Sequence, residues 1–297
     1  MANVIPVVFC FDKRIILGAS VAIKSLLDCA KESTTYDVRI FHSDLSLENQ
    51  KNLSMLCANT RHNISFHYIN PKIFENAPKN KGSWSEIVYY RFLIPHILNE
   101  YDRAIYSDVD VLFKDDLSDL YNTDLTEFEL GAVRAELNTP NSIGHKYFEG
   151  NKKQYIYWSG LLIFNNKVFK ENDVFSKLIH NATENFDRLK FFDLDLMNIT
   201  CQKIKTLDFK YCVLQSIYYN EDLNASNDYR YLKNIYSGEE LCESKSKPVI
   251  IHYAGKPGKP WRMKNPYGDY QNYIDKLPKG LRRYTFRDFR KRLFNKV

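Results

Sequence analysis

The sequence has few glycines and prolines and no long apolar run. With 11 glycines and 10 prolines among 297 residues, it differs from collagen-like and low-complexity chains. No segment reaches the roughly eighteen apolar residues that a membrane-spanning helix needs. The first residues lack the basic start and the long apolar core of a signal peptide, so we expect the protein in the cytoplasm.

Paired cysteines are also missing. No C-x-x-C pair occurs, and the scatter of the cysteines indicates neither a zinc site nor a disulfide framework in a chain of this size. We therefore expect reduced thiols that are mostly buried. The six cysteines are Cys10, Cys29, Cys57, Cys201, Cys212 and Cys242.

What the chain does contain is an alternation of apolar strands and amphipathic helices. The patterns predict strands over 4–11, 36–42, 64–69, 130–134, 158–164 and 249–253. They predict helices over 16–29, 46–57, 85–98, 172–185 and 193–201, and a polar loop over 138–153. This alternation is typical of βαβ units, so we expect an α/β fold with a Rossmann-like, mostly parallel central sheet flanked by helices.

Two carboxylates stand one residue apart on an apolar strand expected over 104–112. Side chains in a strand alternate between faces, so Asp108 and Asp110 are expected on the same side. Neighbouring carboxylates repel unless a cation lies between them, and Mg²⁺ and Mn²⁺ prefer oxygen ligands. The pair therefore predicts a divalent metal site at a strand end, where such sheets bind ligands. Two solvated acids are the alternative.

A second group of polar residues follows the strand expected over 249–253. His252 is followed by a loop that contains Gly255, Lys256 and Lys259. Imidazole is a common metal ligand, and a lysine on a glycine-containing loop can hold phosphate as a point charge. A histidine at a strand end is more often structural when it stands alone. Beside the acid pair, it predicts a metal site of two aspartates and one histidine with open positions.

An ordered set of short motifs resembles glycosyltransferase family 8 over about residues 4–262. This is the group of retaining bacterial lipopolysaccharide galactosyl- and glucosyltransferases that also includes glycogenin. The motifs are Phe9-Cys10-Phe11-Asp12, Tyr90-Arg91, Asp108-Val109-Asp110, Ser159-Gly160-Leu161-Leu162, Asp193-Leu194-Asp195, His252-Tyr253-Ala254-Gly255 and Lys259-Pro260-Trp261. The resemblance implies a GT-A fold over residues 1–262, a UDP-sugar donor, and Mn²⁺ or Mg²⁺ as cofactor.

The resemblance also implies roles for individual residues. The metal ligands would be Asp108, Asp110 and His252. The donor nucleotide would be bound by Cys10, Phe11, Asp12, Arg14, Val109, Gly255 and Lys259. The donor-sugar pocket would contain Arg91, Trp158, Ser159, Asp193 and Leu194. The catalytic residues would be Asp193, Arg91 and Asp108.

Four departures from the family pattern change what is expected. Arg14 stands where the family usually has asparagine, and Gly255 and Lys259 are one residue further apart than usual, so Lys256 competes for the phosphate role. Trp158 replaces an asparagine, and Leu194 replaces a polar residue that is often glutamine. Both replacements exchange hydrogen-bonding capacity for apolar bulk. They predict a donor other than UDP-galactose held in the usual way, or a one-residue shift in these two motifs.

The implied reaction is transfer of a hexose, with retention, from a UDP-sugar to a glycan or glycolipid of the cell envelope, such as a lipo-oligosaccharide core. Leu194 has no nucleophilic atom. Either Asp193 is the nucleophile or, as we favour, substitution occurs on the same face through an ion-pair-like transition state. One alternative is a haloacid-dehalogenase-type phosphatase with Asp108 as nucleophile and Asp110 as acid/base. Another is an inactive UDP-sugar-binding homologue.

Residues 263–297 form a basic tail. Apolar residues recur there at helical spacing, namely Phe286, Phe289, Leu293 and Val297. Between residues 276 and 297 the single acid is Asp288, against Lys276, Lys279, Arg282, Arg283, Arg287, Arg290, Lys291, Arg292 and Lys296, a net charge of +8 in a chain of +6. The tail predicts a basic amphipathic helix and peripheral attachment to an anionic membrane surface. A solvated end and a helix packed on the domain are the alternatives. Because no nucleic-acid motif occurs, we expect no nucleic-acid partner.

Overall fold

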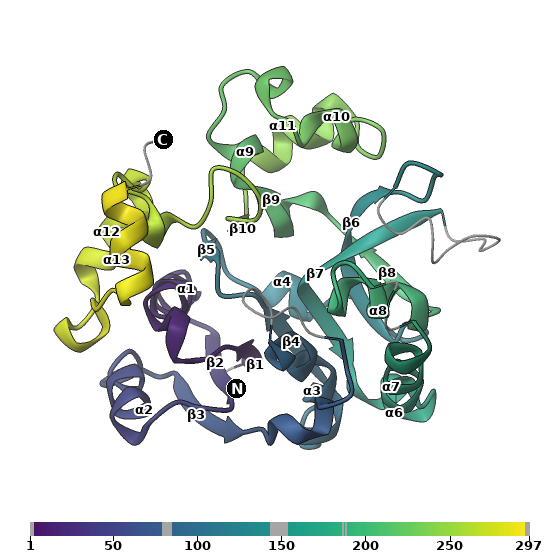
Figure 1. The fold of residues 1–297 in the computed structure, drawn as a ribbon, viewed down its shortest axis with the longest axis horizontal. Coiled ribbons are helices and arrows are strands. Elements are labelled where there is room, and N and C mark those ends of the chain that lie inside the picture. The colour runs from purple at the N-terminus through teal and green to yellow at the C-terminus, as the bar shows by residue number, and fades with distance from the viewer. Residues whose placement is uncertain (1–2, 79–84, 143–153, 186, 188, 295–297) are drawn as a thin grey trace.

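A seven-stranded mixed sheet forms the centre of the protein in a computed structural model, which describes residues 3–78, 85–142, 154–185, 187 and 189–294. The strand order is β3-β2-β1-β4-β7-β6-β8 (Figure 1). The strands are β1 (Asn3–Cys10), β2 (Thr34–His42), β3 (Asn63–Tyr68), β4 (Arg103–Ser107), β6 (Leu130–Leu137), β7 (Tyr155–Asn165) and β8 (Ile204–Leu207). All neighbours pair in parallel except β7, which is antiparallel to β4 and β6. The predicted α/β class with a mostly parallel sheet is confirmed.

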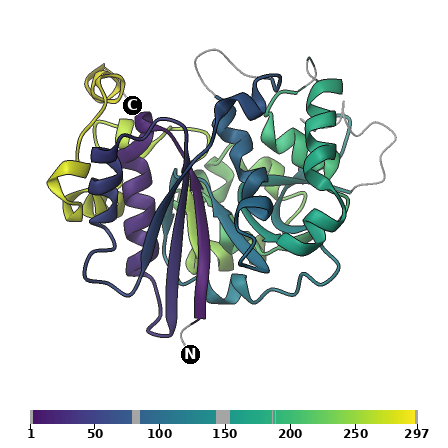
Figure 2. The same ribbon diagram turned by 90° about the horizontal axis from the view of Figure 1, so that it is seen from below.

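Helices cover both faces of this sheet. Alternate residues of β1 show the two layers, because Val7 and Phe9 belong to one buried cluster and Val8 and Cys10 to the other. Figure 2 shows α1 (Ile16–Asp28) on one side of the strands, and the helices α6 (Asn166–Glu171), α7 (Val174–Glu184) and α8 (Asp193–Thr200) on the other. The short helices are α2 (Leu47–Ser54), α3 (Ile94–Ile97) and α4 (Ser118–Tyr121).

A second, three-stranded sheet stands beyond the end of β4. It contains β5 (Val111–Phe113), β10 (Ile250–His252) and β9 (Val213–Leu214), in the order β5-β10-β9. Strand β10 is antiparallel to β5, so that His252 pairs with Val111, and parallel to β9. This small sheet brings a segment from late in the sequence beside the Asp108–Asp110 turn.

Two predicted elements are wrong in form. The strand expected over 104–112 is interrupted, since β4 ends at Ser107 and β5 starts at Val111 in the other sheet. The helix expected over 85–98 is a 3₁₀ helix, Glu86–Leu93, followed by the single turn α3. Six of the eight 3₁₀ residues are buried, whereas an α-helix on a sheet normally buries one stripe.

The other predicted elements are present with shifted ends. Helix α2 is shorter than the 46–57 segment, and Ser46 caps it by accepting a hydrogen bond from the amide of Asn49 at 3.2 Å. Strands β6 and β7 extend beyond 130–134 and 158–164. Most of the loop expected over 138–153 lies outside the described residues. Strands β8 and β9 are not predicted by the sequence patterns.

Helices α9 (Gln215–Tyr218), α10 (Tyr229–Leu232) and α11 (Gly238–Ser246) lie beside the small sheet, and α12 (Gly268–Lys276) and α13 (Phe286–Phe294) lie near α1 (Figure 1). Tyr270 and Ile274 bury one side of α12 in the same cluster as α1. Helix α13 is found where the tail predicted a helix, although Val297 and Lys296 lie outside the described residues. The division at residue 262 stays a prediction. Among the described residues, no helix is long and apolar enough to cross a bilayer.

Candidate active site

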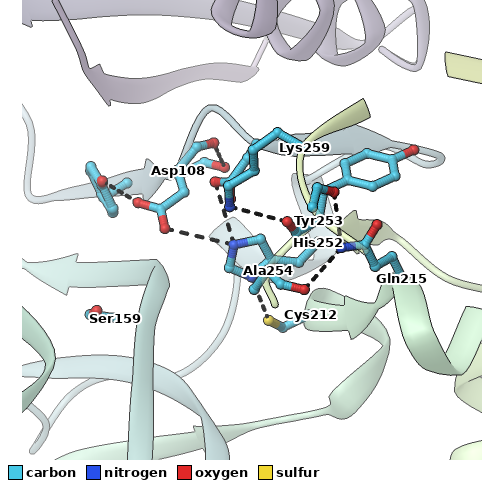
Figure 3. Close-up of polar contacts among 12 residues, drawn as sticks. Asp108, Ser159, Cys212, Gln215, His252, Tyr253, Ala254 and Lys259 are labelled. Atoms are coloured by element: carbon cyan, nitrogen blue, oxygen red, sulfur yellow. Dashed lines mark hydrogen bonds and ion pairs between the residues drawn. The ribbon is translucent and has the colours of Figure 1, made fainter. Parts of the chain in front are cut away.

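Asp108 and Asp110, in the turn between β4 and β5, converge with His252 of β10. Figure 3 shows Asp108 and His252 facing each other. The amide of Asp108 donates to the carbonyl of Gly160 at 2.8 Å, and the amide of Tyr253 donates to the carbonyl of Asp110 at 2.8 Å. Asp108, Asp110 and His252 are called the triad here, and one ligand atom of each lies within 4.8 Å of the others. The predicted metal-ligand set is therefore brought together. The turn after β4 brings it together, and the strand alternation that we expected is absent there.

The close approach of these side chains depends on Gly160 in β7. A Cβ atom at this position would lie 2.6 Å from Cε1 of His252 and 3.1 Å from an Oδ atom of Asp108. Real side chains do not pack at the first distance, so glycine makes room for the imidazole. Two carboxylates and one imidazole form a donor set that suits Mn²⁺ or Mg²⁺. The residues therefore fit a divalent cation.

Opposite charges hold this cluster together. Burial penalises a charge on His252, but the Asp110 carboxylate raises the pKa of the imidazole well above its ordinary value. Burial likewise opposes a charge on Asp110, and Lys259 and His252 nevertheless lower the pKa of this carboxyl. The Lys259 ammonium donates to Asp110 Oδ2 and, at 3.1 Å, to the carbonyl of Tyr253. Asp110 is thus held ionised beside a lysine from the predicted phosphate loop.

Cys212 contacts the other ring nitrogen of His252. Its Sγ atom lies 3.4 Å from Nδ1, and both side chains are buried. His252 Nε2 then faces the carboxylates, 3.7 Å from Asp108 Oδ2 and 3.5 Å from Asp110 Oδ1. Such partners fix the orientation of a ligating imidazole. No local spacing in the sequence pairs Cys212 with His252, so the motifs did not predict this contact.

Arg91 forms the centre of a second cluster next to the triad. Its Nη1 donates to the carbonyl of Ser159 at 2.6 Å and lies 3.1 Å from Asp193 Oδ2. Its Nη2 lies 3.3 Å from Asp108 Oδ1, and the guanidinium carbon is 4.2 Å from the centroid of the Tyr106 ring. The Tyr106 hydroxyl donates to Asp108 Oδ1 at 2.5 Å. Arg91 thus bridges two predicted catalytic carboxylates, and Tyr106 is a further contact that the sequence did not indicate.

Asp193 is the first residue of α8 and is buried. Its Oδ2 accepts a hydrogen bond from the Ser159 hydroxyl at 2.6 Å. Burial raises the pKa of Asp193 to about 6, although Arg91 and Ser159 favour the ionised form. The carboxylate is therefore charged at neutral pH but takes up a proton under mildly acidic conditions.

The predicted nucleotide residues lie at and after the end of β1. Cys10, Phe11 and Asp12 are buried, as is Val109 in the turn of the acid pair. Burial raises the pKa of the Cys10 thiol, so it stays protonated. Asp12 accepts hydrogen bonds from the amide of Arg14 at 2.8 Å and from its Nε at 2.7 Å. Arg14 is thus folded onto Asp12, and its nucleotide contact stays a prediction.

The loop after β10 presents Lys259 to the triad. Gly255 and Gly258 have φ angles of +71° and +125°, a region that favours glycine. Lys256 is exposed, whereas Lys259 is directed at Asp110. Of the two lysines considered for the phosphate role, this arrangement favours Lys259.

The two unusual residues are each next in sequence to a residue of the Arg91 cluster. Trp158 precedes Ser159 in β7, is partly buried, and packs beside Phe209 with 6.2 Å between ring centroids. Leu194 follows Asp193 in the first turn of α8 and is half-buried. Their place in a donor-sugar pocket stays a prediction.

Residues 6–265 match the protein-family model described as glycosyl transferase family 8, which is most of the chain. The chain belongs to glycosyl transferase family 8. This membership confirms the resemblance seen in the motifs. It does not favour the phosphatase alternative for Asp108 and Asp110.

Three curated relatives are 24–29% identical to the chain over the aligned residues. The lipopolysaccharide 1,3-galactosyltransferase of Salmonella typhimurium is 24% identical over 294 residues, covering 92% of this chain and 77% of the relative. A Haemophilus influenzae relative is 25% identical over 226 residues, 76% of this chain and 64% of its own length. Glycosyltransferase GlyA of Streptococcus pneumoniae is 29% identical over 183 residues, 61% of this chain but 22% of its own length. The chain thus spans less than two thirds of the last two relatives.

Solved structures share the fold. The galactosyltransferase LgtC, in complex with donor and acceptor sugar analogues, superimposes with a TM-score of 0.76 at 20% identity, covering 97% of this chain and all of LgtC. The apo structure of the bifunctional glycosyltransferase WbbM gives a TM-score of 0.72 at 20% identity and covers 99% of this chain and 52% of WbbM. The GT-A fold expected from the motifs is confirmed.

Proposed function

We propose that this family 8 protein is a metal-dependent, retaining hexosyltransferase that uses a UDP-sugar. The observation that carries the proposal is the Asp108–Asp110–His252 triad beside the Arg91–Asp193 cluster. Asp108 belongs to both groups, so a site for a diphosphate-bound cation and a site for a sugar adjoin each other. The relatives named as glycosyltransferases support the reaction class.

The leaving group is the UDP diphosphate, which becomes more negative as the glycosidic bond breaks. Asp108, Asp110 and His252 would hold a Mn²⁺ or Mg²⁺ ion, which supplies charge stabilisation for this diphosphate. Lys259 adds a fixed positive charge on the same side, and Gly255 permits close approach of the loop backbone. Cys10, Phe11, Asp12, Arg14 and Val109 would hold the uridine part.

Positive charge develops at the anomeric carbon at the same time. Asp193 and Asp108 would stabilise it, and Arg91 fixes the orientation of both carboxylates. Because Asp193 Oδ2 is already engaged by Arg91 and Ser159, we favour substitution on the same face over attack by Asp193. Trp158 and Leu194 would give the donor-sugar pocket apolar walls, which favours a sugar other than galactose held in the usual way.

We infer that the acceptor is a cell-envelope glycan or glycolipid, reached from the cytoplasmic face of the membrane. The relative named as a lipopolysaccharide galactosyltransferase supports this class. Helix α13 supports the location, because Phe286, Phe289 and Leu293 are 78%, 52% and 58% exposed among basic residues. An exposed apolar stripe with flanking positive charge favours an anionic membrane surface.

The test is release of UDP from a panel of UDP-sugars by the purified protein with Mn²⁺. We expect slow hydrolysis of one donor, which stops with EDTA and in Asp110→Asn. Asp124→Asn is the matched control, because Asp124 is an exposed carboxylate outside the triad that accepts hydrogen bonds from the amide and hydroxyl of Thr126 in its own turn. Binding of UDP without turnover of any donor, also with candidate acceptors, would instead indicate the inactive homologue. Hydrolysis of aryl phosphates would contradict the proposal.

A further inference from the structure

A buried amide closes the loop that carries Lys259. Gln215 is the first residue of α9 and is fully buried. Its Nε2 donates to the carbonyl of Ala254 at 3.0 Å and to the carbonyl of Gly258 at 3.2 Å (Figure 3). These two carbonyls stand at the two ends of the turn between β10 and Lys259. One side chain therefore ties both ends of the turn together.

The amide itself is held at its other end. The Tyr267 hydroxyl lies 3.5 Å from Gln215 Oε1 and is directed at it as a donor. The carbonyl that Lys259 contacts belongs to Tyr253, the residue just before Ala254. The Lys259 ammonium and the Gln215 amide thus hold neighbouring carbonyls, those of Tyr253 and Ala254, in the same short stretch of backbone. A displacement of this stretch would move the Lys259 ammonium relative to Asp110.

We propose that Gln215 is a positioning residue for the UDP diphosphate, acting through the loop that presents Lys259. The inference rests on the proposed function, because it requires UDP to bind beside Lys259. Gln215 does not itself reach the triad: it holds carbonyl oxygens, and the lysine makes the contact with Asp110.

Glutamine suits this task for a chemical reason. Two carbonyl acceptors require two N–H donors from one group, and a primary amide provides both. Methionine has a similar length but donates no hydrogen bond, and an ionised glutamate would place negative charge against the two carbonyls. Gln215→Met therefore removes both bonds with little change of volume, and Gln215→Glu removes them with the shape retained.

The experiment is calorimetric titration of UDP and of uridine in the presence of Mn²⁺. Loss of two hydrogen bonds in Gln215→Met should weaken UDP binding by at least about fivefold, with uridine binding changed less than about twofold. Asn220→Ala is the matched control, since this amide donates to the carbonyl of Ser216 next to Gln215 and does not hold the loop. It should bind UDP as the wild type does.

A double-mutant cycle with Lys259→Ala separates positioning from general damage. If Gln215 acts through Lys259, Gln215→Met should weaken UDP binding further by less than about twofold in the Lys259→Ala background. Additive losses, equal losses for uridine, or wild-type affinity in Gln215→Met would overturn the inference. If Gln215→Met does not fold, Gln215→Glu takes its place in the cycle. If the wild type itself does not bind UDP, the proposed function fails together with the inference. If the wild type binds UDP and Gln215→Met binds it equally well, only the inference about Gln215 fails.

Discussion

Single buried charges determine how the site responds to pH. Asp193 and Arg91 lie in the interior, where an ion is costly unless an opposite charge compensates it. The Arg91 guanidinium compensates both carboxylates, because its Nη1 lies 3.1 Å from Asp193 Oδ2 and its Nη2 lies 3.3 Å from Asp108 Oδ1. One guanidinium shared between two carboxylates does not fully offset burial, which agrees with the raised pKa of Asp193.

We expect the stability contributed by Asp193 to fall as the pH rises. Burial raises the pKa of Asp193 from 3.8 to about 6, so between these values the folded protein binds a proton that the unfolded chain releases. The free energy of unfolding should therefore decrease by about 2 kcal/mol from pH 4 to pH 7 through this group. Urea denaturation of the wild type and Asp193→Asn in EDTA measures it. A difference between the two that does not change with pH would contradict this cause.

The packing of the triad side chains depends on glycine at position 160. Gly160→Ala would place a methyl group 2.6 Å from Cε1 of His252, so the imidazole must move away from the carboxylates. We expect Gly160→Ala to bind Mn²⁺ at least about tenfold more weakly than the wild type in a calorimetric titration. Gly238→Ala is the control, because nothing lies within 4 Å of its added Cβ. Equal Mn²⁺ affinity in both variants would show that this close packing is unimportant.

At the scale of elements, the loop that carries Lys259 is anchored on α1. Trp261, two residues after Lys259, is buried and packs against Gly18 in the first turn of the helix. A Cβ on Gly18 would lie 2.8 Å from the indole ring. Helix α1 and the loop after β10 are thus in direct contact. The residues proposed to bind uridine and those proposed to bind the diphosphate therefore share one support.

Gly18→Ala should destabilise the protein despite the higher helix propensity of alanine. Propensity favours alanine by about 1 kcal/mol, whereas overpacking against a fixed ring costs about 1–3 kcal/mol. We expect a lower free energy of unfolding in urea. Gly268→Ala, at the start of α12 with open space around its Cβ, should have no such cost. A stabilised Gly18→Ala would mean that Trp261 moves freely.

The sequence predicted the elements whose signal is local. Alternation of apolar segments was sufficient for β1, α1 and β2, since each forms from its own periodicity. The break after Ser107 was not predictable in this way, because β5 leaves the main sheet to pair with β10 from late in the chain. The motifs grouped Asp108, Asp110 and His252, which the structure brings together, and their metal-binding role stays a prediction. Cys212 and Gln215 were missed, since their contacts are set by the small sheet and its loop.

At the scale of the whole molecule, positive charge is concentrated at one end of the chain. Residues 276–297 carry +8, so the remainder is slightly acidic. Asp288 holds α13 on the domain: its side chain is buried and accepts a hydrogen bond from Arg262 Nε at 2.6 Å. Phe286, Phe289 and Leu293 remain exposed on the same helix. This arrangement suits a surface that is both apolar and anionic.

We expect the protein to sediment with vesicles that contain phosphatidylserine, and less so as salt is raised, because salt screens the basic residues. Replacing Phe286, Phe289 and Leu293 together with serine should abolish sedimentation without lowering the melting temperature, since all three are exposed. Leu47→Ser, an 83% exposed leucine on α2, is the control and should sediment normally. Unchanged sedimentation of the triple variant would exclude α13 as the attachment site.

The measurement that tests the central claim most directly is thermal unfolding with UDP and Mn²⁺. At about one hundred times its dissociation constant, UDP should stabilise the wild type by about 2.7 kcal/mol. We predict that EDTA or Asp110→Asn removes this stabilisation, while Asp124→Asn keeps it. Stabilisation by UDP that survives both EDTA and Asp110→Asn, or no stabilisation at all, would contradict a metal-dependent nucleotide site at Asp108, Asp110 and His252.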